Sequence, residues 1–110
     1  MIDQKTFDEL RQMVGEGFIH ELLETFFESC PQLIAEMQAA LVVGDADAFQ
    51  RAAHSMKSNS ASFGAFELAA QARLLETMGR ERRQDGAGQL LAELETTYSQ
   101  VESELKELAG

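Results

Sequence analysis

Two histidines are the only side chains of this 110-residue chain that titrate near neutral pH without help from their surroundings. A neutral imidazole can act as a nucleophile, a proton carrier or a metal ligand, so the direction in which each histidine points decides its chemistry. The other strong nucleophile, a thiol, occurs once, at Cys30. A single cysteine excludes a disulfide framework and a cysteine-based zinc site.

His54 is predicted to face water. The helix that carries it has an apolar stripe made of Phe49, Ala52, Ala53 and Met56. On a helical wheel His54 lies roughly 140° from the centre of that stripe. Its neighbours along the exposed face are Gln50, Lys57, Ser58 and Ala61. A cation one turn away and small side chains beside the imidazole would let a partner approach closely, although an ordinary exposed histidine fits the same pattern.

His20 is predicted to lie at the edge of an apolar stripe, with glutamates at positions 16, 21 and 24. We interpret it as a boundary residue with no function. A carboxylate metal site in a helical bundle needs Glu and Glu-x-x-His pairs on several helices. The fragments of that spacing around His20 have no matching set elsewhere.

The elements that position these residues are predicted to be helices. The chain has one proline and no tryptophan, and no segment alternates as a strand would. A short helix is expected from Asp3 to about Met13. Longer helices are expected over 18–43, from Asp45 or Asp47 to Ser60 or Ser62, from beyond Gly64 to about Met78, and after a loop at 79–88. The predicted fold is all-α, an antiparallel four-helix bundle with a short additional N-terminal helix, in one domain of residues 1–110.

The second helix has the clearest apolar period. Steps of four and three residues connect Ile19, Leu23, Phe26, Cys30, Leu33, Met37 and Ala40. Pro31 lies inside this helix, removes one backbone donor and crowds the carbonyl of Phe27. We therefore expect a kink there and not two separate helices.

Residues 52–76, AAHSMKSNSASFGAFELAAQARLLE, resemble the signature of the histidine phosphotransfer (HPt) domain family. In that family a histidine is followed by a lysine, small residues, a glycine and a Leu-Glu or Leu-Gln pair. The matching positions here are His54, Lys57, Ser58, Gly64, Leu75 and Glu76. The family commonly has glycine where this chain has Ser58, which is still a small residue.

The resemblance implies a phosphorelay intermediate that accepts a phosphoryl group on His54 from a receiver-domain aspartate and passes it to another. Lys57 would stabilise the phosphoryl charge, and Glu76 would orient the imidazole, unless it is an ordinary exposed glutamate. The implied partners are response regulator receiver domains and a hybrid histidine kinase. No cofactor is expected, because the magnesium ion would belong to the receiver. No ATP-binding glycine loop occurs, so we expect a phosphoryl carrier and not an enzyme.

The family also implies a docking surface around the histidine. The candidates there are Gln50, Arg51, Ser58, Ala61 and Gly64, of which Gly64 would also let the chain turn tightly. On the preceding helix, Phe18 and Leu22 form part of a second apolar stripe and are candidates, although such residues are more often core. A non-phosphorylated helical adaptor that uses the same face is the alternative function, and Ser58 favours it.

The charge distribution fits an acidic partner. The formal net charge is −10, which argues against nucleic acid and anionic membranes as partners. Residues 51–83 hold six basic and three acidic side chains, whereas the remainder holds three basic and sixteen acidic ones. An alternative explanation applies to three of the basic residues, because a helix C-terminus favours nearby cations such as Arg80, Arg82 and Arg83. With no signal-peptide pattern at its start, the chain is expected to be a cytoplasmic monomer.

Overall fold

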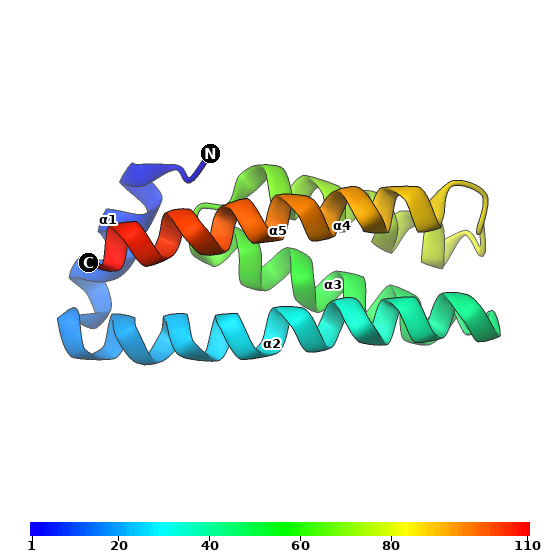
Figure 1. The fold of residues 1–110 in the computed structure, drawn as a ribbon, viewed down its shortest axis with the longest axis horizontal. Helices are drawn as coiled ribbons and strands as arrows, with labels where there is room; N and C mark the ends of the chain where they lie inside the picture. Colours follow the sequence, from blue (N-terminus) through cyan, green and yellow to red (C-terminus); the bar gives the residue numbers. More distant parts are fainter.

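The structure, a computed structural model, describes residues 1–110 as five helices and no strand. The helices are α1 (Gln4–Val14), α2 (Glu16–Val43), α3 (Ala46–Ser62), α4 (Phe66–Arg80) and α5 (Ala87–Ala109). Helices α2 to α5 run antiparallel to their sequence neighbours, and α1 lies at the end of the bundle where the chain terminates (Figure 1). The predicted helical bundle with a short leading helix is confirmed.

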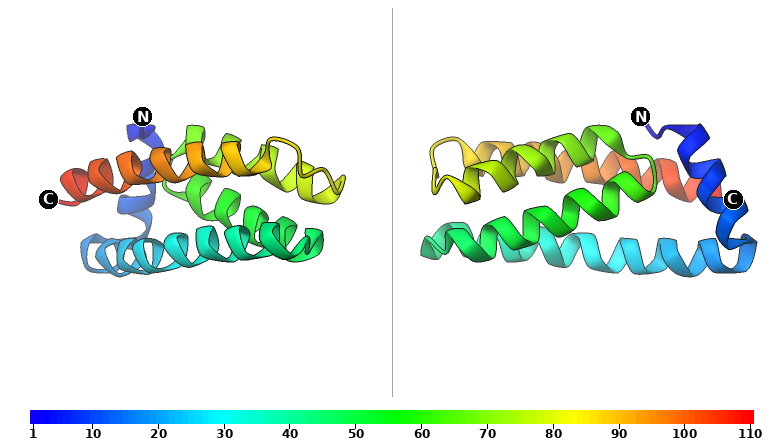
Figure 2. Two further views of the ribbon diagram at one scale, coloured as in Figure 1. Left: turned by 45° about the vertical axis from the view of Figure 1, so that its right-hand side comes forward. Right: turned by 180° about the vertical axis from the view of Figure 1, so that it is seen from behind.

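The order of helices around the bundle is α2, α3, α4, α5. Helix α3 packs against α2 and α4, and α5 also packs against α2 and α4, so α3 and α5 are diagonal to each other. The short α3–α4 turn makes these two helices close neighbours along their length, as Figure 2 shows from behind. The outer face of α3 therefore lies in solvent, with α4 at one side and α2 at the other.

The helix boundaries follow from side-chain caps and glycines. Asp3 accepts from the Thr6 backbone N–H at 3.1 Å and caps α1, and Asp45 caps α3 by accepting from Ala48 at 3.0 Å. Gly15 has φ of +87° and separates α1 from α2. The second helix therefore begins at Glu16, two residues before the predicted start.

The core contains 25 buried apolar residues, which come from all five helices and, for Ile2, Phe63 and Ala65, from the segments beside them. The predicted stripe of α2 is correct except at one position, because Ile34 is buried and Leu33 is only partly buried. Steps that alternate between three and four residues average about 3.5 residues per turn, so the predicted stripe moves gradually around a straight helix of 3.6 residues per turn. Helix α2 also packs against both α3 and α5, which widens its buried face.

Pro31 does not divide the second helix. Helix α2 is a single helix from Glu16 to Val43 with the proline inside it, as predicted. Pro31 is exposed, and the flanking residues Cys30 and Ile34 are buried. Packing on both sides of the proline holds the helix on the core, so the missing hydrogen bond is tolerated on the solvent side.

The predicted loop at 79–88 is too long. Gly79 is helical and buried, and α5 already begins at Ala87. A Cβ atom at Gly79 would lie 3.1 Å from backbone atoms of Gln50 in α3. This glycine therefore permits close contact between α3 and α4 instead of ending the helix.

Candidate functional site

His54 lies near the middle of α3 on its solvent face, with 59 % of its side chain exposed. Its Nδ1 atom is 2.7 Å from the Oε2 atom of Glu76, which comes from α4. The Glu76 side chain is only 6 % exposed. The interpretation of Glu76 as an ordinary exposed glutamate is therefore wrong, because the close contact of α3 and α4 buries this carboxylate beneath the imidazole.

Two cations share the Glu76 carboxylate with His54. Lys57 Nζ donates to Oε1 at 2.7 Å, and an Nη atom of Arg80 lies 3.6 Å from Oε2. A buried carboxylate is costly unless it is paired and hydrogen bonded. His54, Lys57 and Arg80 supply that pairing, so the carboxylate has a fixed position instead of the mobility of a surface glutamate.

The balance of burial and pairing keeps Glu76 ionised at neutral pH. Burial on its own raises the pKa of Glu76, but the hydrogen bonds and positive charge of Lys57, together with those of His54, outweigh it and lower the pKa below its ordinary value of 4.5. An ionised carboxylate can only accept hydrogen bonds. Its contact with His54 therefore requires the proton on Nδ1.

This proton position leaves Nε2 of His54 with a free lone pair. Nε2 has no hydrogen-bond partner in the structure, and the ring is exposed. A neutral imidazole with Nδ1–H held by a carboxylate is a nucleophile at Nε2, and the carboxylate stabilises the positive ring formed when Nε2 is substituted. The arrangement can therefore accept an electrophilic group from solvent or from a docked partner.

The surroundings of His54 contain most of the predicted neighbours. A shallow polar hollow is lined by Gln50, Arg51, His54, Ser55 and Glu76. Ser58 is exposed one turn beyond the histidine, and Ala61 is half-buried. Arg80 and Ser55 were not among the predicted site residues. Arg80 follows Glu76 by four residues on a helix, and that spacing could have revealed it.

Gly64, predicted as a partner contact, is not on the surface. It is buried in the α3–α4 turn with φ of +82°, and a Cβ atom there would lie 2.7 Å from the carbonyl oxygen of Asp3. The Asp3 backbone N–H donates to the Gly64 carbonyl at 2.9 Å. Gly64 therefore closes the turn beneath the start of α1 and is not exposed to a partner.

The two predicted contacts on α2 differ in their distance from His54. The rings of Phe26 and Phe63 lie 4.9 Å apart, which fixes how α2 lies against the end of α3. Counting along both helices from that pair places Phe18 about 25 Å from His54 along the bundle axis. Leu22 is nearer and lines a groove between α2 and α3. By the same count Leu22 is still about 20 Å from His54, so neither predicted contact on α2 lies beside the imidazole.

The other nucleophilic or metal-binding candidates lack such an arrangement. His20 is exposed instead of lying at the core edge, and it has no hydrogen-bond partner. Cys30 is buried, and this burial, with the nearby Glu102 charge, raises the pKa of its thiol to about 12. No three His, Cys, Asp or Glu side chains converge on a common point.

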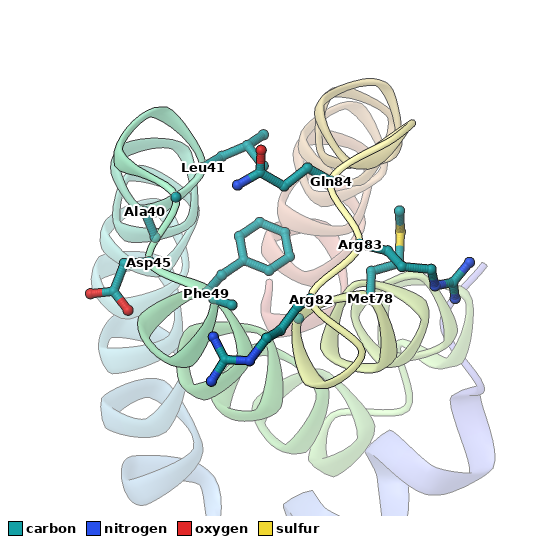
Figure 3. A pocket seen from close by; sticks show the side chains of 11 residues that line it. Ala40, Leu41, Asp45, Phe49, Met78, Arg82, Arg83 and Gln84 are labelled. Carbon is teal, nitrogen blue, oxygen red and sulfur yellow. The ribbon is translucent and has the colours of Figure 1, made fainter.

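A cavity of about 260 Å³ lies at the C-terminal end of α4, beyond Glu76, where the α2–α3 and α4–α5 connections meet. Figure 3 shows Phe49 within it, with Arg82 and Arg83 at its edge. Both arginines are paired, Arg82 with Asp47 and Arg83 with Glu81. None of its lining residues is a histidine, cysteine or serine, so the cavity offers no nucleophile comparable to His54.

Similarity to known proteins extends over most of the chain. A family model described as the Hpt domain matches residues 21–104. The chain is 28 % identical to histidine-containing phosphotransfer protein 2 of Arabidopsis thaliana over 108 residues, which cover 93 % of this chain and 69 % of that protein.

Among solved structures, histidine-containing phosphotransfer protein B (HptB) from Pseudomonas aeruginosa PAO1 is similar, with a TM-score of 0.93 and 29 % sequence identity. The match covers 98 % of this chain and 93 % of that one. No helix combines the length and apolar character needed to cross a bilayer.

Proposed function

Because this chain belongs to the Hpt domain family, and so has a phosphotransfer role in phosphorelays, we propose that His54 is the residue that carries the phosphoryl group. The observation that supports this assignment is the 2.7 Å contact between Nδ1 and the buried Glu76 carboxylate. The donor is a receiver-domain aspartyl phosphate, and the acceptor is the aspartate of another receiver domain.

The proposed step is an in-line displacement at phosphorus. Nε2 of His54 attacks the phosphorus of the aspartyl phosphate, so that a P–N bond forms while the P–O bond to the aspartate breaks. The aspartate leaves as a carboxylate, and Nδ1 keeps its proton. The phosphorylated ring is then cationic, and Glu76 balances its charge. A second aspartate reverses the step, so the chain ends unchanged.

Lys57 has two roles in this proposal. Its hydrogen bond to Oε1 helps to fix Glu76, and its ammonium, one helical turn from His54, can turn toward the oxygens of an incoming phosphoryl group. Because phosphoryl transfer depends on positioning and charge stabilisation, these two groups supply much of what the chain needs.

We propose that the chain works as a carrier without a cofactor of its own. The magnesium ion that assists transfer at an aspartate would be held by the acidic side chains of the receiver. The partners would be response regulator receiver domains and, upstream, a hybrid histidine kinase. The exposed Arg51 would face the acidic partner near the transferring group.

The adaptor that never carries phosphate is the second candidate, and Ser58 is the feature that favours it. Ser58 is exposed beside His54, so it adds a hydroxyl where the family commonly has none. Its backbone carbonyl accepts from Ser62 at 3.1 Å, and its own hydroxyl has no partner. A free hydroxyl could hydrogen bond the phosphoryl group, so the carrier function is compatible with this serine.

The deciding experiment is intact mass spectrometry after incubation with phosphoramidate and with a phosphorylated receiver domain. One adduct that is acid-labile and base-stable would identify a phosphohistidine. Absence of an adduct with either donor, in protein whose helical circular dichroism is intact, would favour the adaptor. Ser58→Gly would then test whether the serine blocks transfer.

A further inference from the structure

Helix α4 has a second apolar face that no other helix covers. Phe66 is 50 % exposed and Leu74 is 55 % exposed. Ala70 lies between them, and the spacing of four residues places all three on one side of the helix. We refer to Phe66, Ala70 and Leu74 as the α4 ridge.

The α4 ridge lies beside the proposed phosphoryl site. It borders a groove whose remaining lining residues are Lys57, Ala69, Arg73 and Thr77. Lys57 is the residue that also hydrogen bonds Glu76, the partner of His54. The other exposed large apolar residues lie toward the two ends of the bundle and are Met1, Met13, Phe18, Val42 and Val43. A protein that reaches His54 across α4 must therefore cover the ridge.

The charges at this groove are available to an acidic partner. Arg73 and Arg51 have no ion pair, whereas each of the other four arginines has a carboxylate partner. Free guanidinium groups are notable in a chain with 19 acidic side chains and a net charge of −10. Arg73 lies within the groove, and Arg51 lines the hollow on the other side of His54. An apolar surface with an unpaired arginine fits a partner that presents apolar side chains beside carboxylates.

We propose that the α4 ridge and Arg73 form a docking surface for the receiver domain that exchanges a phosphoryl group with His54. The proposal rests on the proposed function of His54. It extends the docking surface to α4, whereas the sequence predicted apolar docking residues on α2 alone. Phe66 and Leu74 would supply the apolar anchors of this contact, and Arg73 would pair with a carboxylate near the receiver's aspartate.

The test separates docking from chemistry by using two phosphoryl donors. Phosphoramidate needs no protein docking, whereas receiver domains from the same organism, loaded with acetyl phosphate, do. The test variants are Ala70→Glu and Phe66→Ser/Leu74→Ser. We expect both to accept phosphate from phosphoramidate at the wild-type rate, and to lose about tenfold or more in transfer from the receiver at subsaturating concentration.

Matched controls change the same residue types away from the site. Ala92→Glu alters an exposed alanine on α5, the helix diagonal to α3, and Val42→Ser/Val43→Ser removes exposed apolar side chains at the far end of α2. Both controls should transfer at the wild-type rate with either donor. Ala70→Glu leaves the core side chains in place, so it decides the outcome if the double variant does not fold.

Several results would overturn the proposal. If Ala70→Glu accepts phosphate from the receiver at the wild-type rate, the α4 ridge is not the docking surface. If the wild type accepts phosphate from phosphoramidate but from no receiver domain, this class of partner is excluded. A dimer in sedimentation that Ala70→Glu dissociates, with transfer unchanged, would make a second copy of the chain the occupant. Failure of the wild type with phosphoramidate and with every receiver domain would instead contradict the proposed function.

Discussion

The two histidines of this chain are both exposed and both helical, yet only one has a partner. His54 on α3 contacts the buried Glu76 carboxylate at 2.7 Å. His20 on α2 is surrounded by glutamates in its own sequence segment, and Glu16, Glu21 and Glu24 are all exposed. A solvated glutamate is mobile and orients nothing, whereas a buried one has a single position. Exposure therefore makes a histidine accessible, but a buried acceptor from a second helix defines which nitrogen can react.

The difference between the two regions originates in helix packing. At Gly79 the backbones of α3 and α4 approach so closely that a Cβ atom would lie 3.1 Å from Gln50. This contact lies one turn from Glu76 and allows the carboxylate to reach beneath His54. The side of α2 that carries His20 faces solvent and has no neighbouring helix to supply an acceptor.

The largest effect is expected from replacing the histidines themselves. His54→Gln should abolish phosphoryl acceptance, because no nucleophilic nitrogen remains above Glu76, whereas His20→Gln should accept phosphate as the wild type does. Intact mass after incubation with phosphoramidate measures both, and thermal melting should be nearly unchanged in both, since each side chain is exposed. An adduct that persists in His54→Gln would remove His54 as the site.

Glu76→Gln makes the His54 region resemble the His20 region. The amide keeps the shape of the carboxylate but loses its charge, so Nδ1–H is held less firmly and the phosphorylated ring is not balanced. We expect the rate of phosphorylation to fall about 10- to 100-fold. Nitrogen chemical shifts of the His54 ring should show a smaller population protonated at Nδ1.

The matched control for this change is Glu21→Gln beside His20, where the carboxylate is exposed and neither the rate nor the ring shifts should change. If Glu76→Gln folds and is phosphorylated at the wild-type rate, the buried carboxylate has no part in orienting the imidazole. The contrast between the two histidines would then reflect exposure alone.

Lys57→Ala is expected to have a smaller effect. The variant removes one charged hydrogen bond to Glu76 and the ammonium available to the phosphoryl oxygens, while His54 and Arg80 still hold the carboxylate. A loss of about tenfold in transfer rate corresponds to ~1.4 kcal/mol, within the usual range for a charged hydrogen bond. Lys5→Ala on α1 is the control, because Lys5 has no ion pair. Equal rates for wild type and Lys57→Ala would show that the ammonium is not near the transferring group.

The direction of His54 could be predicted from sequence because it depends only on the periodicity of one helix. Phe49 and Met56 identify the buried side of α3, and His54 lies opposite them. The burial of Glu76 could not be predicted in this way. It depends on the distance between α3 and α4, and Gly79, which sets that distance, has the local pattern of a helix breaker.

The α4 ridge was missed for a related reason. Apolar residues of α4 lie on two faces, one with Leu68 and Leu75 and one with Phe66 and Leu74. Sequence periodicity cannot say which of these faces the bundle covers, because both have helical spacing. Leu33 was predicted to be buried for the same reason. The spacing of apolar residues identifies the buried side of a helix, but only the packing of its neighbours defines where that side ends.

The smallest expected effect is the pH dependence of stability that Glu76 contributes. Its pKa in the folded chain is lowered from the ordinary 4.5, so the unfolded chain binds a proton at higher pH than the folded chain does. The ionised carboxylate therefore stabilises the fold fully above pH 4.5, and this contribution is lost as the pH falls through the lowered pKa. Wild type should melt a few degrees above Glu76→Gln at neutral pH, and the two melting curves should converge on acidification. Glu21→Gln should follow the wild type throughout, because Glu21 is exposed and gains no partner on folding. If the gap between wild type and Glu76→Gln stayed constant down to strongly acidic pH, the charge of Glu76 would not be the source of the difference in stability.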